Sequence, residues 1–566
     1  MKPSPRYALL WLLPLGFLAL FYFYPLGSIL ALSFGRGEDG LAAPFLEALG
    51  SESIRRVLGF TVWQAALSTL LTLALGLPAA YLFARFEFRG RHLLRALTGV
   101  PFVLPTLVVA AAFSALLGPR GWVNLALMSL LGLDAPPIEF LNSFAAILTA
   151  HVFYNLTIVL RLVGDFWARL DPRLEGAARA LGAGRWAAFR HVTLPLLAPA
   201  MLAAALLVFI FDFTSFGVVL VLGGPRFATL EVEIYTQTIS LFNLPLAGAL
   251  SSIQLAATLA LTVAYTRLNA RLSRPLALRP PENARRPLNT PRRRLLAGLT
   301  LGALAVLALA PLGALAARSL VRLEPDRGQR TAQTGLTLEF YRALASGERV
   351  SGFYDSPLGA IRTSLGYAAA TVALSLALGG PAAWALARRP EARLSRILDP
   401  LLMLPLGTSA VTLGLGFIVA LDIPPLDLRA SPLLIPLAHT LVAFPFIVRS
   451  LTPALRSIQP KLRQAAAVLG ASPWQAVRHI DLPLAARAGL VAAAFAFTIS
   501  LGEFGATALV ARPEFPTLPV MIYRFLSQPG GLNYGQAMAL ATLLMVVTTI
   551  GMLGIERLRI GEAGEF

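Results

Sequence analysis

The chain has 566 residues, of which 56% are hydrophobic and 14% are charged, and its formal net charge is +19. Soluble globular proteins have about 25% charged residues, so this composition excludes an ordinary soluble enzyme. The chain has no cysteine, which rules out disulfides and cysteine metal sites.

Long apolar runs recur along the whole chain, each near the ~20 residues that a helix needs to cross a bilayer. The first run is longer than a signal-peptide core and lacks an obvious cleavage site, so we expect it to be a membrane helix. The pattern predicts an all-α integral membrane protein with about twelve transmembrane helices. In chain order the runs are 7–33, 59–84, 93–117, 143–160, 197–222, 245–265, 295–317, 361–387, 397–421, 431–448, 488–510 and 534–555.

The positive charge is concentrated on one side of this predicted topology. Lys and Arg outnumber Asp and Glu at both termini and in the loops that follow the even-numbered helices. The loops on the opposite side are nearly neutral. This pattern is typical of cytoplasmic loops, so both termini are expected in the cytoplasm. The arginines at 285, 286 and 292–294 then belong to a cytoplasmic linker, and nucleic-acid binding is not expected.

One polar segment occurs twice. Residues 181–195 read LGAGRWAAFRHVTLP and residues 469–483 read LGASPWQAVRHIDLP, with nine of fifteen positions identical at an offset of 288. His151 and His439 match at the same offset. The repeat predicts two halves, 1–270 and 295–566, joined by the basic linker 271–294. Because each half has six helices, the halves are parallel, unlike the inverted repeats of many secondary transporters.

Each copy of the repeat predicts two short helices that meet at an elbow on the cytoplasmic side. In the first loop, 171–195, Asp171-Pro172 is a typical helix start, and Gly182 and Gly184 interrupt the helix. In the second loop, 457–483, Gly470 is the break and Ser472-Pro473 begins the next helix. An interfacial anchor, with Trp at the headgroups and Arg on phosphate, is the alternative interpretation.

These loops resemble the EAA loop of permease subunits of bacterial ABC importers, in which EAA is followed by a Gly and, later, by Leu-Pro. Gly176-Ala177-Ala178 and Gln464-Ala465-Ala466 occupy the EAA positions, and Leu194-Pro195 and Leu482-Pro483 supply the ends. The family Glu is absent from both loops, although Glu175 stands beside Gly176. The resemblance implies a type I importer permease fold, whose loops dock into an ATPase subunit. It assigns this coupling role to Gly182, Trp186, Arg190, Gly470, Trp474 and Arg478.

The chain lacks the means to hydrolyse ATP. Its only lysines, Lys2 and Lys461, do not stand in a phosphate-binding Walker A pattern. We therefore expect a non-catalytic transport subunit without a cofactor of its own, which works with two copies of a separate ATPase. The longest outer loop has about 40 residues, less than a domain needs, so a separate periplasmic binding protein is also expected.

Two acids are predicted inside membrane helices, where charge is costly and usually functional. Asp212 lies in the fifth helix and Glu503 in the eleventh, and the repeat aligns them with Ser500 and Ser215. The interpretation is a translocation path for a cation. Polar packing, or hydrogen bonds to His151 and His439, is the alternative. Paired membrane histidines are more typical of interhelical hydrogen bonds than of a metal site.

The fused arrangement resembles thiamine and ferric-iron permeases. Residues 118–133, 150–156 and 500–526 are most similar to the thiamine type, so thiamine is the expected cargo and ferric iron the alternative. A twelve-helix secondary transporter of the major-facilitator type is a further alternative. It would need no ATPase, and EAA-like loops are not expected in it.

Overall fold

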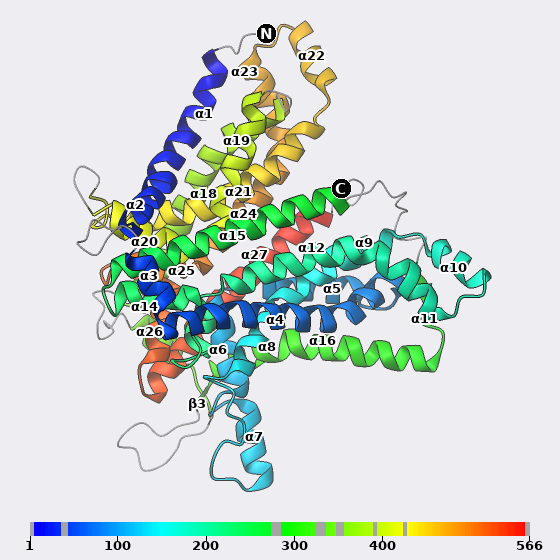
Figure 1. The fold of residues 1–566 in the computed structure, drawn as a ribbon, viewed down its shortest axis with the longest axis vertical. Helices are drawn as coiled ribbons and strands as arrows, with labels where there is room; N and C mark the ends of the chain where they lie inside the picture. The colour runs from blue at the N-terminus through cyan, green and yellow to red at the C-terminus, as the bar shows by residue number, and fades with distance from the viewer. Residues whose placement is uncertain are drawn as a thin grey trace. The chain divides into compact units, whose positions relative to one another are not determined.

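The computed structural model describes residues 5–34, 43–272, 285–322, 335–346, 356–388, 393–422 and 427–560 (Figure 1). Among these residues, eleven helices are long and apolar enough to cross a membrane, or twelve if one bent pair is counted as a span. The prediction of an all-α membrane protein with about twelve spans is confirmed.

The first part of the chain folds into helices of very different length. They are α1 (Pro5–Leu18), a π-helical turn (Ala19–Phe23), α2 (Tyr24–Ser33), α3 (Ala43–Gly50), α4 (Glu52–Arg85), α5 (Arg91–Val103), α6 (Thr106–Leu117), α7 (Trp122–Leu131), α8 (Phe144–Ile158), a π-helical turn (Val159–Val163), α9 (Gly164–Arg169), α10 (Pro172–Ala180), α11 (Arg185–Ala188), a π-helical turn (Phe189–Thr193), α12 (Leu194–Phe213), α13 (Gly217–Leu222), α14 (Leu230–Ile239) and α15 (Leu244–Leu272).

The second part has a similar succession. It comprises α16 (Pro291–Arg318), α17 (Glu339–Ala345), α18 (Pro357–Arg388), α19 (Arg393–Met403), a 3₁₀ turn (Leu404–Gly407), α20 (Ala410–Ala420), α21 (Leu434–Ser457), α22 (Pro460–Val468), α23 (Pro473–Ala476), a π-helical turn (Val477–Asp481), α24 (Leu482–Gly502), α25 (Gly505–Val510), α26 (Leu518–Ser527) and α27 (Gly531–Ile560). Short strands pair β1 (Phe86–Glu87) with β2 (Arg286–Pro287) and β3 (Val321–Arg322) with β4 (Gly335–Leu336).

Two compact units divide the chain, and each combines parts of both predicted halves. Unit 1 comprises Met1–Ala48, Ile234–Leu255 and Ser319–Phe566, and unit 2 comprises Leu49–Glu233 and Ala256–Arg318. Thus α1 and α2 pack in unit 1 against α18 and α20, and α16 packs in unit 2 against α4, α5 and α6. The compact units therefore do not share the boundaries 1–270 and 295–566 drawn from the repeat.

The core of unit 1 explains why α1 belongs to it. Trp11, Leu18 and Tyr22 are buried in one apolar cluster with Phe417 and Phe444. The hydroxyl groups of Tyr22 and Thr408 also form a 2.7 Å hydrogen bond. Close van der Waals packing and interhelical hydrogen bonds hold membrane helices together, so these contacts hold α1 against the second part of the chain.

Glycine permits the same close helix approach in both units. A Cβ on Gly76 of α4 would lie 2.7 Å from Val159 Cγ1, and a Cβ on Gly379 of α18 would lie 2.8 Å from Ile447 Cγ2. Small residues let helix backbones approach closely in membranes. These glycines stand at matching places in the repeat, so the second and fourth membrane helices of each half pack alike.

Several predicted spans are broken, which corrects the sequence-based boundaries. The runs 197–222 and 488–510 each divide into two helices, α12 and α13, and α24 and α25. Glu503 lies in a break rather than inside a helix, and Asp212 lies in the last turn of α12. The run 93–117 is broken at Leu104, whose extended backbone precedes Pro105. The run 397–421 corresponds to a pair of helices bent by 95°.

Candidate functional site

Both repeated loops form the predicted elbow. In the first loop, Asp171 caps α10 by accepting a 3.0 Å hydrogen bond from the backbone N–H of Arg173. In the second, Ser472 and Gln475 form a reciprocal capping box at the start of α23. The caps set where each short helix begins.

The glycine that both copies of the repeat share ends the first short helix of each elbow. Gly182 and Gly470 have φ of +92° and +81°, a conformation that side chains with a Cβ rarely adopt. The backbone N–H of Gly182 donates to Arg179 O and that of Ala183 to Ala178 O, both at 3.1 Å. Gly470 and Ala471 make the same pair of bonds in the second loop. This Schellman arrangement satisfies the last carbonyl groups of the helix. It also explains why the glycine follows Ala178 or Ala466 by four residues in both loops.

The second short helix of each elbow is not a separate element, which corrects the prediction. In the first loop α11 runs through a π-helical turn directly into α12, and in the second α23 does the same into α24. Pro195 and Pro483 stand in the first turn after these π-helical turns. Because proline lacks the N–H for an α-helical bond, a π-helical turn just before it lets the helix continue. A movement of the elbow would therefore act on the membrane helix itself.

The elbows expose large apolar side chains beside basic ones. Trp186 and Trp474 are 71% and 67% exposed, and Arg190 and Arg478 are exposed too. Leu181, Val468 and Leu469 at the helix ends are also exposed. These leucine and valine positions were missed in the sequence, although the repeated Leu-Gly was their signal.

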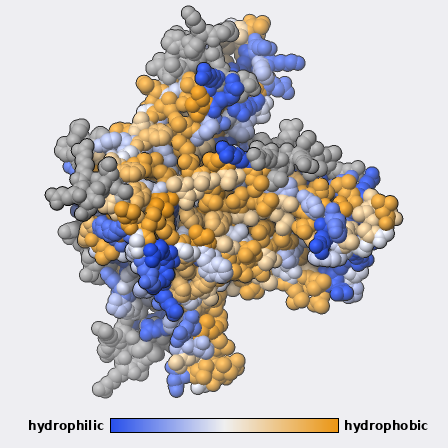
Figure 2. All heavy atoms as spheres, viewed as in Figure 1, coloured by the Kyte–Doolittle hydropathy of each residue, from blue (hydrophilic) through white to orange (hydrophobic). Residues whose placement is uncertain are grey.

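Figure 2 shows hydrophilic residues gathered over α22 and α23 and over α10, with hydrophobic ones among them. Such mixed apolar and basic surfaces are typical of protein interfaces.

The predicted intramembrane residues of the first half form one buried network in unit 2. The Nδ1 atom of His151 lies 3.5 Å from Asp212 Oδ1 and 3.1 Å from Ser68 Oγ. Its Nε2 atom lies 2.8 Å from Ser215 Oγ. Asn155 donates a 2.6 Å hydrogen bond to Asp212 Oδ1, whereas Asp212 Oδ2 is buried without a hydrogen-bond partner.

A second network joins the equivalent residues in unit 1. The two ring nitrogens of His439 lie 2.8 Å from Ser500 Oγ and 2.8 Å from Thr507 Oγ1. Glu503 accepts hydrogen bonds from the backbone N–H groups of Ala506 and Thr507, at 2.8 and 3.0 Å. Its carboxylate therefore caps α25, where a negative charge is favoured by the helix N-terminus.

The two histidines thus lie 3.5 and 3.2 Å from the acids of their own networks, and they form hydrogen bonds with serine and threonine hydroxyl groups. Asp212 and Glu503 are only 1% and 8% exposed, so neither faces an open passage in this structure. Their role in a cargo path stays a prediction. Within the described ranges, no group of three or more His, Asp and Glu residues is placed to hold a metal ion.

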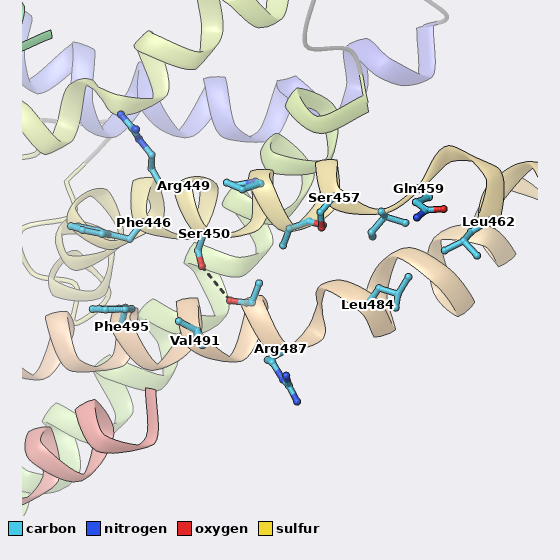
Figure 3. Close-up of a pocket in the computed structure, with 14 residues that line it drawn as sticks. Phe446, Arg449, Ser450, Ser457, Gln459, Leu462, Leu484, Arg487, Val491 and Phe495 are labelled. Atoms are coloured by element: carbon cyan, nitrogen blue, oxygen red, sulfur yellow. Dashed lines mark hydrogen bonds between the residues drawn. The ribbon is translucent and has the colours of Figure 1, made fainter. Parts of the chain in front are cut away.

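A groove of about 740 Å³ lies between α21 and α24 in unit 1, next to the second elbow. Figure 3 shows Phe446 and Phe495 at one end and Gln459 and Leu462 at the other, while Arg449 and Arg487 point away from each other. No acidic residue is among the described residues that line this groove. This lining therefore offers no carboxylate that would attract a cation, and it includes neither Glu503 nor His439.

Comparison with known proteins gives consistent similarities. The family described as "Binding-protein-dependent transport system inner membrane component" matches residues 72–276 and 379–558. The "Thiamine transport system permease protein ThiP" of Brucella abortus (strain 2308) is 32% identical over 535 residues, 94% of this chain and 92% of that protein. The protein of the same name from Escherichia coli (strain K12) is 28% identical, over 95% of this chain and 96% of its own length. A bacterial ABC transporter that imports alginate has a chain 20% identical to this one, with a TM-score of 0.41, covering 48% of this chain and 98% of that chain.

Proposed function

This chain belongs to the family of binding-protein-dependent transport system inner membrane components, and we propose that it is the permease subunit of an ATP-driven thiamine importer. The family makes it a multi-pass protein of an inner membrane. The cargo proposal rests on the 32% identity to a thiamine permease over 94% of the chain. Ferric iron is not favoured, because both relatives described above are thiamine permeases. The family match also disfavours a secondary transporter of the major-facilitator type.

The energy for transport would come from ATP hydrolysis by a separate partner subunit. With only two lysines and no Walker A pattern, this chain would bind no ATP and need no cofactor. Two copies of an ATP-binding cassette ATPase would dock at the two elbows, where Trp186 and Trp474 are exposed beside arginines. Because each elbow continues into α12 or α24, a push on the elbow would move a membrane helix.

Cargo would arrive from a periplasmic binding protein and cross between groups that favour a cation. Asp212, Ser215 and His151 would serve the path in the first half, and Glu503, Ser500 and His439 in the second. A cation that leaves water loses solvation, and carboxylates that become accessible as the helices move would offset part of that cost. The charge pattern of the loops supports cytoplasmic placement of both termini.

Reconstitution tests this proposal directly. The chain would be co-expressed with the ATPase and the binding protein encoded nearest to its gene, purified, and placed in proteoliposomes. We expect two ATPase copies per chain, and uptake of radiolabelled thiamine that requires both ATP and the binding protein. Radiolabelled ferric iron is the matched control cargo. Iron uptake without thiamine uptake would contradict the cargo, and robust ATPase activity of the isolated chain would contradict its role as a non-catalytic subunit.

A further inference from the structure

A buried acid ties the second elbow to the core of unit 1. Asp481, in the π-helical turn after α23, is 1% exposed. Its Oδ1 atom accepts a 2.6 Å hydrogen bond from Nε of Arg463 on α22. Its Oδ2 atom accepts hydrogen bonds from Nη2 of Arg388 at 2.8 Å and from Nε1 of Trp384 at 3.2 Å, both at the end of α18. One carboxylate thus joins α22 of the elbow, the start of α24 and the end of α18.

The first elbow carries its carboxylate on α10 rather than in the π-helical turn, and this carboxylate, Glu175, attracts Arg85 electrostatically. At the 288-residue offset, Asp481 corresponds to Thr193 and Arg463 to Glu175. Thr193 Oγ1 donates a hydrogen bond to Glu175 Oε2 at 3.4 Å, which is long. Arg85, the counterpart of Arg388 in the GLPAAYLFAR and GGPAAWALAR segments, donates instead to the backbone oxygen of Leu170 at 3.1 Å.

Aromatic rings also connect the first elbow to α4. The exposed Trp186 stacks on Phe189, with centroids 5.6 Å apart and planes at 27°. Phe189 lies 6.1 Å from Trp167, which lies 5.1 Å from Tyr81 of α4. In the second half the corresponding residues are Val477, Leu455 and Trp384. The row of rings therefore has no counterpart in the second half, because Val477 and Leu455 are not aromatic. Trp384 instead donates a hydrogen bond to Asp481.

These two connections differ in how they resist movement. A buried carboxylate is tolerated only while its charged partners stay in place, because an unpaired buried charge is strongly unfavourable. Hydrogen bonds also require particular distances and angles. Aromatic contacts also prefer particular arrangements, but a shift of the rings leaves no buried charge unpaired. The second elbow is thus held to α18 by a carboxylate in its own π-helical turn. The first elbow instead relies on Glu175 of α10, which attracts Arg85, and on contacts between rings.

We propose that Asp481, with Arg463 and Arg388, is the positioning cluster through which the second elbow transmits ATPase movement to the membrane helices, and that the first elbow transmits this movement through different contacts. This inference rests on the proposed function, because it assumes that an ATPase docks at each elbow. Asp481 touches neither cargo nor nucleotide in this proposal. It acts by fixing α22 to α18 and α24.

The test measures thiamine transported per ATP hydrolysed by the complete transporter in proteoliposomes. Asp481→Asn removes the charge at nearly constant shape, and we expect the ratio to fall about tenfold, the upper range of single-residue effects on coupling. Asp481→Glu should restore much of it. Thr193→Val, at the matching position of the first elbow, is the control. It removes one long hydrogen bond and should change the ratio less than about twofold.

A second variant keeps the test informative if Asp481→Asn does not fold. The double substitution Arg463→Glu with Asp481→Thr reproduces the pair of the first elbow and keeps one carboxylate near Arg388. We expect it to assemble with two ATPase copies and to show the same low transport ratio. Unchanged ratios in both variants, or a loss of thermal stability with an unchanged ratio, would overturn the proposal. Failure of the unmodified chain to co-purify with ATPase would instead reject the proposed function.

Discussion

The Nε2 atom of His439 lies 3.2 Å from the Oε2 atom of Glu503, and both side chains are buried. The hydroxyl of Thr507 donates to the same carboxylate oxygen at 2.7 Å. In the other network, Asp212 has one oxygen bound by Asn155 and the other without a partner. The two acids that the repeat places three residues apart therefore have unequal hydrogen bonding.

This inequality predicts different results for removal of each charge. Glu503→Gln removes one of two oxygens that accept backbone hydrogen bonds, so it should lower the free energy of unfolding by about 1–3 kcal/mol. Asp212→Asn retains the bound oxygen and should cost less stability. If both acids serve a cation path, both variants should lower thiamine uptake more than they lower expression. Uptake per amount of membrane protein checks this, and undiminished uptake by the double variant would reject the path assignment.

Bulky residues at the elbow glycines should uncouple transport. Gly182→Trp with Gly470→Trp forces a side chain onto backbone with φ of +92° and +81°, which costs about 1–2 kcal/mol at each position. We expect the protein to stay in the membrane but to lose ATPase co-purification and uptake. Gly298→Trp is the control, because Gly298 lies inside α16, outside both elbows, with open space around it. If the double variant binds ATPase and transports normally, the elbows are only interfacial anchors.

Trp186 and Trp474 should contribute to ATPase binding rather than to folding. Both are exposed, so Trp186→Ala with Trp474→Ala should leave thermal stability within about 0.5 kcal/mol. Affinity for the ATPase should fall at least about tenfold, as is usual for a central aromatic residue of an interface. Pull-down titration measures this. Trp63→Ala, at an exposed tryptophan of α4 away from the elbows, should not change the affinity.

The glycine at the α4 crossing should be intolerant of a methyl group. Gly76→Ala places a Cβ against Val159 and should lower the free energy of unfolding by about 1–3 kcal/mol. Val159→Ala in the same chain should recover part of that loss, because it removes the opposing methyl groups. Thermal unfolding of the single and double variants gives the interaction energy. Gly59→Ala, in the same helix with open space, is the matched control, and an equal loss there would contradict a packing origin.

The sequence alone determined the features that depend on local chemistry. Apolar runs of about 20 residues predict membrane helices because a backbone in lipid must satisfy its own hydrogen bonds. The elbow could be predicted at Gly182 and Gly470 because glycine adopts positive φ without strain. The duplication predicted that His151 and His439 have equivalent places, and each does contact the acid of its own half.

Only the tertiary structure decided the features that depend on contacts far apart in the chain. The break that turns Glu503 into the cap of α25 has a local signal in the flanking Gly502 and Gly505, but the contact of Glu503 with His439, 64 residues away, has none. The packing of α1 on α18, and of α16 on α6, depends on which apolar faces fit together, and nearly every membrane helix has such a face. The partners of Asp481 come from α18 and α22, 93 and 18 residues away, and their convergence follows from helix packing rather than from spacing.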